Sequence, residues 1–304
     1  MPIYAEGLND MIITVDGTLL ASKNYLDYPH PDGGNCSDLI ILTKVNNLLW
    51  QGSGVIDGQG FMWWNREYLG RNIYGRPNLH SLSNSRNVEY TGIKWMNSPA
   101  WHLRQDNCDS LYFHDMEIYV DMWGQLSLDK IFGLGLDYTV NVPTYPLNTD
   151  GIDPAASNVL IERVKITNHD DAVAVKPSHS WDDISPCSEN IIVRDCIVNF
   201  GVGMTIGSVP PRNEYACVRN VQFQNITFHH PYKAIYVKTN PGTTTSMLPG
   251  SGGEITNITY TDIEIHNPIW WNIYIGPQQQ KQPGGAGPGC MLYPLAGGDS
   301  TCAT

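Results

Sequence analysis

The sequence predicts an all-β protein folded as a right-handed parallel β-helix, in which short strands wind into stacked coils. Only 16% of the 304 residues are charged, whereas Gly (29), Pro (20) and Tyr (16) are plentiful, which favours short strands and turns over long helices. Segments that open with a polar turn residue and continue as alternating strands recur along the chain. Recurring strand–turn–strand units of this size are typical of a solenoid, whose coils bury their inner faces against one another.

Seven segments share one pattern: a leading polar residue, an alternating strand, a polar or Gly break and a second alternating strand. They begin at Asn47, Asn87, Ser110, Asn158, Asn190, Asn220 and Asn257. We interpret the leading asparagines as structural, because an Asn side chain can bond to turn backbone and stack coil on coil. A β-sandwich is the alternative, since Asp-Gly pairs begin at residues 16, 32, 57 and 150. These pairs do not recur in step with the repeat, so the β-helix is preferred.

A single domain is predicted over residues 1–304, because the repeat runs through nearly the whole chain. Residues 122–147 interrupt the repeat and are predicted to form a loop over one face. The Gly- and Pro-rich stretch 276–289 is predicted to be an extended loop with no clear strand after it. Since a solenoid needs capped ends, we expect that a C-terminal coil is missing from this chain.

Charge and cysteine usage narrow the class of protein and its compartment. A net charge of −12 argues against a nucleic-acid partner, and no apolar run reaches the length of a membrane span. Seven cysteines without a Cys-x-x-Cys pair, together with three glycosylation triplets (Asn35, Asn225 and Asn257), favour a secreted, disulfide-containing protein over a cytosolic one with buried thiols. We expect a monomer.

Two acidic clusters are the candidate site. Asn148-Thr149-Asp150 and His169-Asp170-Asp171 lie about one coil apart, so stacking would bring Asp150 beside Asp170 and Asp171. The following coils would add Gly201-Val202-Gly203 and Tyr236-Val237-Lys238. Three carboxylates this close cannot all ionise easily, which would give an acid beside a base, as hydrolysis of a glycosidic bond requires. A calcium site is the alternative, although three Asp side chains supply few of the oxygens that Ca²⁺ takes.

The order of these motifs resembles glycoside hydrolase family 28, the polygalacturonase family, whose motifs run Asn-Thr-Asp, Asp-Asp, Gly-His-Gly and Arg-Ile-Lys. The resemblance covers residues 10–275, and it implies a pectin-lyase-like right-handed β-helix, an inverting mechanism, and neither metal nor cofactor. Carried over by position, Asp170 would be the general acid, while Asp150 and Asp171 would activate the attacking water. Asn148 and Lys238 would contact the substrate.

Two positions depart from the family pattern. Val202 stands where the polygalacturonases have histidine, and Tyr236 stands where they have arginine. Valine cannot form a hydrogen bond, and tyrosine can stack on a sugar but cannot form arginine's bidentate clamp on a carboxylate. The acid–base centre is therefore predicted to act on a pectin-like polysaccharide. The sequence does not fix the identity of the sugar at the cleaved position. Polygalacturonan and a rhamnose-containing backbone are both candidates.

Further side chains are candidates for substrate binding. His169 could substitute for the missing histidine, as could His179. Lys176 ends the strand after the Asp pair, and period-two alternation would place it on the face of Asp170 rather than that of Asp171. Asp153 is interpreted as a turn cap, and the Trp63-Trp64 and Trp270-Trp271 pairs as packing more readily than sugar platforms.

Two other functions stay open at the level of sequence. A non-catalytic glycan-binding β-helix would explain the lost histidine and arginine. A polysaccharide lyase would need a basic residue to abstract a proton and usually calcium, and no arginine base is obvious beside the three aspartates.

Overall fold

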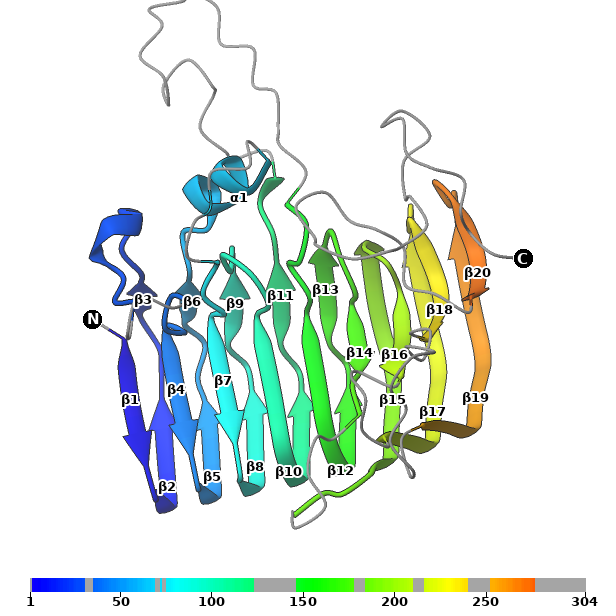
Figure 1. Ribbon diagram of the computed structural model, residues 1–304, viewed down its shortest axis with the longest axis horizontal. Helices are drawn as coiled ribbons and strands as arrows, with labels where there is room; N and C mark the ends of the chain where they lie inside the picture. The colour runs from blue at the N-terminus through cyan, green and yellow to red at the C-terminus, as the bar shows by residue number, and fades with distance from the viewer. Residues whose placement is uncertain are drawn as a thin grey trace, which may run out of the picture.

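The computed structural model describes residues 2–30, 35–68, 72, 75–122, 146–177, 184–209, 216–239 and 252–276, and it confirms the predicted parallel β-helix. Every strand pairing within these ranges is parallel. Figure 1 shows the coils stacked along the long axis, from β1 at the N-terminal end to β19 and β20 at the other. The predicted loops at 122–147 and 276–289 lie almost wholly outside the described residues, as does the stretch on which the expected missing coil depends.

Three parallel sheets run along the molecule. The first contains β1 (Ile3–Glu6), β4 (Ile40–Thr43), β7 (His80–Ser83), β10 (Leu103–His114), β12 (Ile152–Glu162), β14 (Val173–Val175), β16 (Met204–Val209), β18 (Lys233–Thr239) and β20 (Trp271–Gly276). The second contains β2 (Asn9–Thr14), β5 (Asn46–Gln51), β8 (Arg86–Thr91), the later parts of β10 and β12, and β15 (Ser188–Phe200), β17 (Ala216–His229) and β19 (Gly253–His266). The third contains β3 (Thr18–Leu20), β6 (Val55–Asp57), β9 (Lys94–Met96), β11 (Glu117–Tyr119), β13 (Lys165–Asn168) and the ends of β15, β17 and β19.

Helical structure is confined to a 3₁₀ turn, η1 (Tyr25–Asp27), and one short α-helix, α1 (Phe61–Tyr68), among the described residues. The sequence did not predict α1, because its eight residues show too few helical periods. The helix buries Trp63 and Trp64, which confirms that this pair packs. Within the described ranges, no helix has the length and apolar character of a membrane span.

The core lies inside the coils and follows the predicted alternation. Strands β5 and β8 share one burial pattern, in which every second residue after the turn is buried. Identical positions stack from coil to coil; the rings of Tyr90 and Phe113 are parallel at 4.8 Å, and those of Phe223 and Tyr260 stack at 4.6 Å. Since each fully buried large apolar side chain contributes about 1.5–3 kcal/mol, these continuous columns hold the coils together.

All seven leading residues of the repeat adopt the left-handed conformation, with φ between 52° and 59°. Asparagine tolerates this conformation better than most residues. Its side chains also form a ladder along the outside: the amide of Asn190 donates to Asn158 Oδ1 (3.2 Å), and that of Asn220 donates to Asn190 Oδ1 (3.4 Å). The structural role that the sequence predicted for these asparagines is therefore confirmed.

Replacing Asn190 should separate the contribution of its side-chain hydrogen bonds from that of its backbone conformation. Asn190→Ala is expected to lower the free energy of unfolding by about 1–2 kcal/mol, because alanine resists positive φ and breaks two ladder bonds. Asn190→Gly loses the same bonds but accepts the backbone conformation, so its cost should be smaller. Urea unfolding midpoints of the two variants measure the difference. Equal losses would show that the backbone conformation is not what the asparagine provides.

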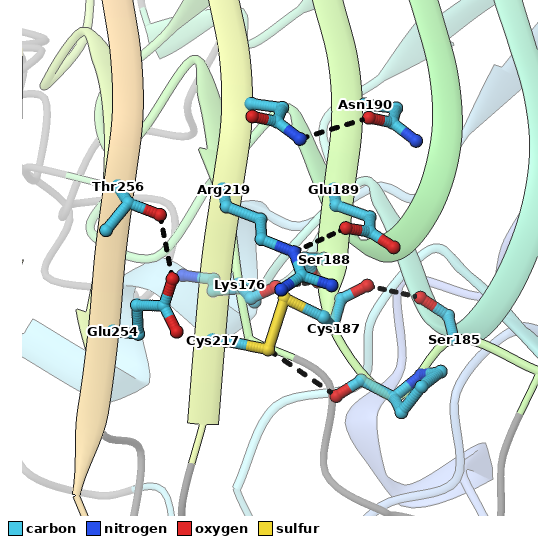
Figure 2. The surroundings of a disulfide bond; sticks show 12 residues. Lys176, Ser185, Cys187, Ser188, Glu189, Asn190, Cys217, Arg219, Glu254 and Thr256 are labelled. Atoms are coloured by element: carbon cyan, nitrogen blue, oxygen red, sulfur yellow. Dashed lines mark hydrogen bonds and ion pairs between the residues drawn. A yellow bond between two sulfur atoms is a disulfide. The ribbon is translucent and has the colours of Figure 1, made fainter.

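One disulfide joins adjacent coils beside the sheet that carries the acidic clusters. Cys187 and Cys217 form it across a sequence separation of 30 residues (Figure 2). Next to it, the Ser188 hydroxyl donates to the carbonyl oxygen of Lys176 (2.6 Å), so this corner is tied to the end of β14. Cys36, Cys108 and Cys196 are buried free thiols, and Cys290 and Cys302 lie outside the described residues. The described residues therefore contain both a disulfide, as the sequence predicted, and three buried free thiols.

Candidate active site

Strand register brings the two acidic clusters together. In the first sheet Ile152 pairs with Val173, Val173 with Met204, Met204 with Ile235 and Ile235 with Ile273. The residues two places earlier therefore form a row across five coils, which we call the aspartate row. It contains Asp150, Asp171, Val202, Lys233 and Trp271, and the Lys233–Trp271 pairing is direct.

Glycines next to this row let the coils approach. A Cβ on Gly151 would lie 2.3 Å from the carbonyl oxygen of Ala172. Gly203 has φ +90°, and a Cβ there would lie 2.2 Å from the carbonyl oxygen of Ala234. The glycine that ends the Gly-x-Gly motif therefore serves backbone packing, which places the carboxylates on one coil beside those on the next.

Asp150, Asp170 and Asp171 converge as the sequence predicted. One oxygen of each lies within 4.8 Å of the others, and all three side chains are buried. The Asp170 carboxylate accepts the backbone N–H of Asn148 and that of Asp171, both at 2.9 Å. Asp171 accepts from the Thr205 hydroxyl (2.7 Å) and from Lys238 Nζ (2.5 Å).

The three carboxyl groups are driven to different protonation states. Burial and the neighbouring charge of Asp171 raise the pKa of Asp170. Burial, with Asp153 and Asp170 nearby, raises the pKa of Asp150 well above its usual value. Burial also opposes ionisation of Asp171, but Lys238 and Lys176 outweigh it and lower its pKa. The cluster therefore favours ionisation at Asp171 and protonation at the two groups beside it.

Two lysines compensate the acidic cluster. Lys176 Nζ lies 3.6 Å from Asp150, 3.5 Å from Asp153 and 3.7 Å from Asp171. The prediction that Lys176 shares a face with Asp170 rather than Asp171 is therefore wrong. Period-two alternation does not hold through residues 169–172, which contain bends, because β14 begins only at Val173. The site at Asp150, Asp170 and Asp171 could offer oxygens to a cation, but the two ammonium groups already balance much of its charge.

Asp153 was interpreted as a turn cap, and the structure corrects this. The residue lies inside β12, with its buried carboxyl group 3.5 Å from Lys176 Nζ. Alternation of buried and exposed residues could not indicate this position, because every residue in the first half of β12 is buried. Asp153 is a fourth acidic member of the cluster.

The buried carboxyl of Asp153 should make stability depend on pH. Burial raises its pKa to about 6, although Lys176 pulls in the opposite direction. A raised carboxyl pKa favours the folded state below the unfolded pKa of about 4, and that contribution is lost as the pH rises through 6. The Asp153→Asn variant has no carboxyl group to ionise at this position. Its free energy of unfolding, relative to that of wild type, should therefore rise by about 2–3 kcal/mol between pH 4 and pH 8. Thermal melts across this range measure it; a pH-independent difference would contradict the assignment.

Side chains outside the motifs position the first acidic cluster. Arg76 donates to the carbonyl oxygens of Pro99 and Leu147 and to Asn148 Oδ1. His102 Nδ1 lies 2.9 Å from the carbonyl oxygen of Asp150, and burial lowers its pKa to about 4, so its imidazole is neutral. Sequence reasoning missed both residues, since they lie 72 and 48 residues from their partners.

Several predicted substrate contacts take other places. His169 is buried with its ring stacked on Phe200 and its Nδ1 3.2 Å from the Tyr232 hydroxyl, and burial lowers its pKa to about 4. As a packed, neutral ring it does not replace the missing histidine. Tyr236 is only 3% exposed, and Lys233 Nζ covers one face of its ring at 3.6 Å. His179 lies outside the described residues.

Comparisons with known proteins identify related sequences. The family model described as glycosyl hydrolases family 28 matches residues 5–283. The chain is 28% identical over 268 residues to a polygalacturonase of Cryptomeria japonica (85% of this chain, 44% of that protein). It is 30% identical over 220 residues to a probable endo-xylogalacturonan hydrolase A of Aspergillus flavus (70% of this chain, 45% of that protein). The chain therefore spans less than half the length of these curated relatives.

Solved structures share the fold. A polygalacturonase from Erwinia carotovora ssp. carotovora superposes with a TM-score of 0.68 at 21% identity, over 90% of this chain and 69% of that one. An endo-xylogalacturonan hydrolase from Aspergillus tubingensis superposes with a TM-score of 0.66 at 22% identity, over 86% of this chain and 63% of that one.

Proposed function

Because this chain belongs to glycosyl hydrolases family 28, we propose that it is a secreted, monomeric glycoside hydrolase that cleaves a pectin-like polysaccharide with inversion. The observation that carries the proposal is the convergence of Asp150, Asp170 and Asp171 with opposed pKa shifts. The family match favours hydrolysis over the lyase and the glycan-binding alternatives.

Asp170 is the general acid in this mechanism. Its raised pKa favours the protonated carboxyl group, which passes its proton to the glycosidic oxygen as the bond from C1 to that oxygen breaks. Asp170 accepts hydrogen bonds from two backbone N–H groups. These bonds hold its side chain in place and are compatible with the carboxylate that forms.

Asp171 is the principal base. It is the carboxylate that Lys238 keeps ionised, and it accepts a proton from the water that attacks C1. Burial raises the pKa of Asp150 well above its usual value, which favours its protonated form, and its Oδ1 has no hydrogen-bond partner among the described residues. That oxygen can therefore orient the water while Asp171 takes the proton.

Polygalacturonan and xylogalacturonan are the candidate substrates. Relatives with comparable identity are named for polygalacturonan and for xylogalacturonan. The side chain of Val202 is buried and has no polar atom, and Tyr236 cannot form arginine's bidentate clamp on a carboxylate. Lys238 and Lys176 are the cations at the carboxylates, but both are engaged by Asp171.

The proposal is tested by measuring reducing ends released from polygalacturonan, xylogalacturonan and rhamnogalacturonan. Wild-type protein is expected to act on at least one of them, and Asp170→Asn is expected to act on none. If no substrate gives release that depends on Asp170, the hydrolase proposal fails.

Inversion is tested separately, from the anomeric configuration of the first product. The first product formed by wild-type protein should carry the anomeric configuration opposite to that of the cleaved bond, because water attacks the face remote from the leaving oxygen. Proton NMR of the anomeric signals, recorded before mutarotation, distinguishes the outcomes. Retained configuration would show that one of the closely spaced aspartates acts as a nucleophile.

A further inference from the structure

A buried asparagine links the backbones of the two acidic clusters. Asn168 ends β13 and is fully buried, directly before the cluster that contains Asp170 and Asp171. Its side-chain amide donates to the carbonyl oxygen of Thr149 (3.0 Å) and to that of Asp171 (2.7 Å). The first of these oxygens belongs to the peptide unit that leads into Asp150. One amide group therefore holds a backbone group of each cluster.

The link lies where the strands are interrupted. β13 ends at Asn168 and β14 begins at Val173, while β12 begins at Ile152, so the three aspartates lie outside regular strands. The backbone N–H of Gly151 donates to the carbonyl oxygen of Asp171 (2.9 Å), which therefore accepts from the backbone and from Asn168. The amide thus adds side-chain hydrogen bonds between coils where a regular ladder is absent.

The orientation of the Asn168 amide follows from its partners. Both are carbonyl oxygens, which only accept hydrogen bonds, so the amide nitrogen has to face them. The Oδ1 atom has no hydrogen-bond partner among the described residues and lies against the next coil, where a Cβ on Gly201 would be 2.6 Å from it. The first glycine of the Gly-x-Gly motif therefore leaves the room that this amide needs.

These contacts distinguish Asn168 from the other asparagines. The ladder asparagines lie outside the coils and bond to one another, whereas Asn168 is buried and bonds to the backbone of the acidic clusters. Asn97 is also buried and follows β9, at the equivalent place two coils earlier in the third sheet. Its side chain donates to Asp57 (3.2 Å) and accepts from the backbone N–H of Asp121 (2.8 Å), neither of which belongs to the acidic clusters. Asn97 therefore provides a matched control.

We propose that Asn168 is a positioning residue of the active site, which clamps the two acidic clusters at the separation that the division between acid and base requires. The clamp acts on the backbone, so Asn168 itself touches no reacting atom. Its consequence for catalysis rests on the proposed function, whereas its effect on the geometry of the aspartates does not.

Kinetics test the catalytic consequence. Asn168→Ala removes both N–H donors, and kcat should fall about 10²-fold, because a misplacement of about 1 Å can cost that much. KM should stay close to its wild-type value, since the clamp holds the aspartates and not the substrate. Asn97→Ala also removes the side-chain bonds of a buried asparagine, and it should keep the wild-type kcat. Thermal melts of both variants verify that they are folded at the assay temperature.

Asn168→Asp keeps the shape of the side chain and makes the clamp depend on pH. The protonated carboxyl group can donate one hydrogen bond, whereas the ionised group donates none and repels the two carbonyl oxygens. The kcat of this variant, relative to that of wild type, should therefore be higher at about pH 4 than at about pH 7. Should Asn168→Ala not fold, this pH dependence decides in its place, and a constant ratio would overturn the inference.

A titration tests the geometry without activity. Burial raises the pKa of Asp150. The charged groups around it are Asp153, Asp170, Asp171, Lys176 and Lys238. Release of the clamp should move Asp150 away from the other cluster and weaken the repulsion between carboxylates, so its pKa should fall in Asn168→Ala. In Asn97→Ala it should stay at the wild-type value. Carbon NMR of labelled aspartate carboxyl groups measures both.

The outcomes separate the clamp from the hydrolase. A pKa of Asp150 that is the same in Asn168→Ala and Asn97→Ala would overturn the clamp, whatever their activities. A lowered pKa together with wild-type kcat would overturn its role in catalysis. Wild-type protein without release that depends on Asp170 would remove the proposed hydrolase, and the titration would still decide whether Asn168 sets the geometry of the aspartates.

Discussion

Asp170→Asn is expected to lower kcat by about 10²–10⁴-fold while leaving the fold intact, because general acid catalysis contributes about that much. Asparagine has the shape of the protonated carboxyl group that the buried site favours, but it cannot transfer a proton to the leaving oxygen. One amide oxygen can still accept a backbone N–H, from Asn148 or Asp171. The variant should therefore bind substrate and fail at bond cleavage.

The measurement is the rate of reducing-end release under saturating substrate, with a thermal melt to verify folding. Glu264→Gln is the control for loss of a carboxylate, since that side chain is 70% exposed and lies in β19, away from the first sheet. It should retain wild-type activity. A modest loss in Asp170→Asn, together with a large loss in Asp150→Asn, would instead assign the acid to Asp150, whose pKa is also raised.

Lys238→Met should impair both stability and activity, because it removes the ammonium group 2.5 Å from a buried carboxylate. Breaking one partner of a buried ion pair costs about 3–5 kcal/mol, since the remaining charge stays buried without compensation. Lys176 still lies 3.7 Å from Asp171 and offsets part of that loss.

The sign of the pH effect follows from the pKa of Asp171. In wild type that pKa is lowered, so its contribution to stability is present above the unfolded pKa and is lost as the pH falls through the folded one. Without Lys238, burial dominates and the pKa of Asp171 rises. The acidic limb of the activity profile should then move to higher pH, and the loss of stability should be greater at pH 7 than at pH 4.

The double variant Lys238→Met with Asp171→Asn separates the effect on stability from the effect on activity. It removes both charges, so it should recover much of the stability while activity stays low. Lys44→Met provides the control, because its ion pair with Glu6 is exposed and remote. An acidic limb that does not move in Lys238→Met would contradict the assignment of Asp171 as the ionised base.

The sequence predicted the coil architecture because its signals are local. The turn of each unit is indicated by a residue that accepts positive φ, as at Asn158 and Asn190. Its strands are indicated by an alternation of period two. It also predicted that Asp150, Asp170 and Asp171 meet, since stacking one coil on the next requires only a repeat length. Residues without a periodic signal were missed, among them Arg76, which reaches Asn148 from another coil.

The sequence by itself thus determined the β-helix, its core columns and the identity of the three aspartates. Only the tertiary structure decided which of them has the lowered pKa, because that pKa depends on burial and on two lysines, Lys176 just after β14 and Lys238 in β18. It also moved Asp153 from a turn into the acidic cluster, buried His169 behind Phe200 and aligned Trp271 with the carboxylates. Distances across coils are set by register between strands, and no single strand contains that information.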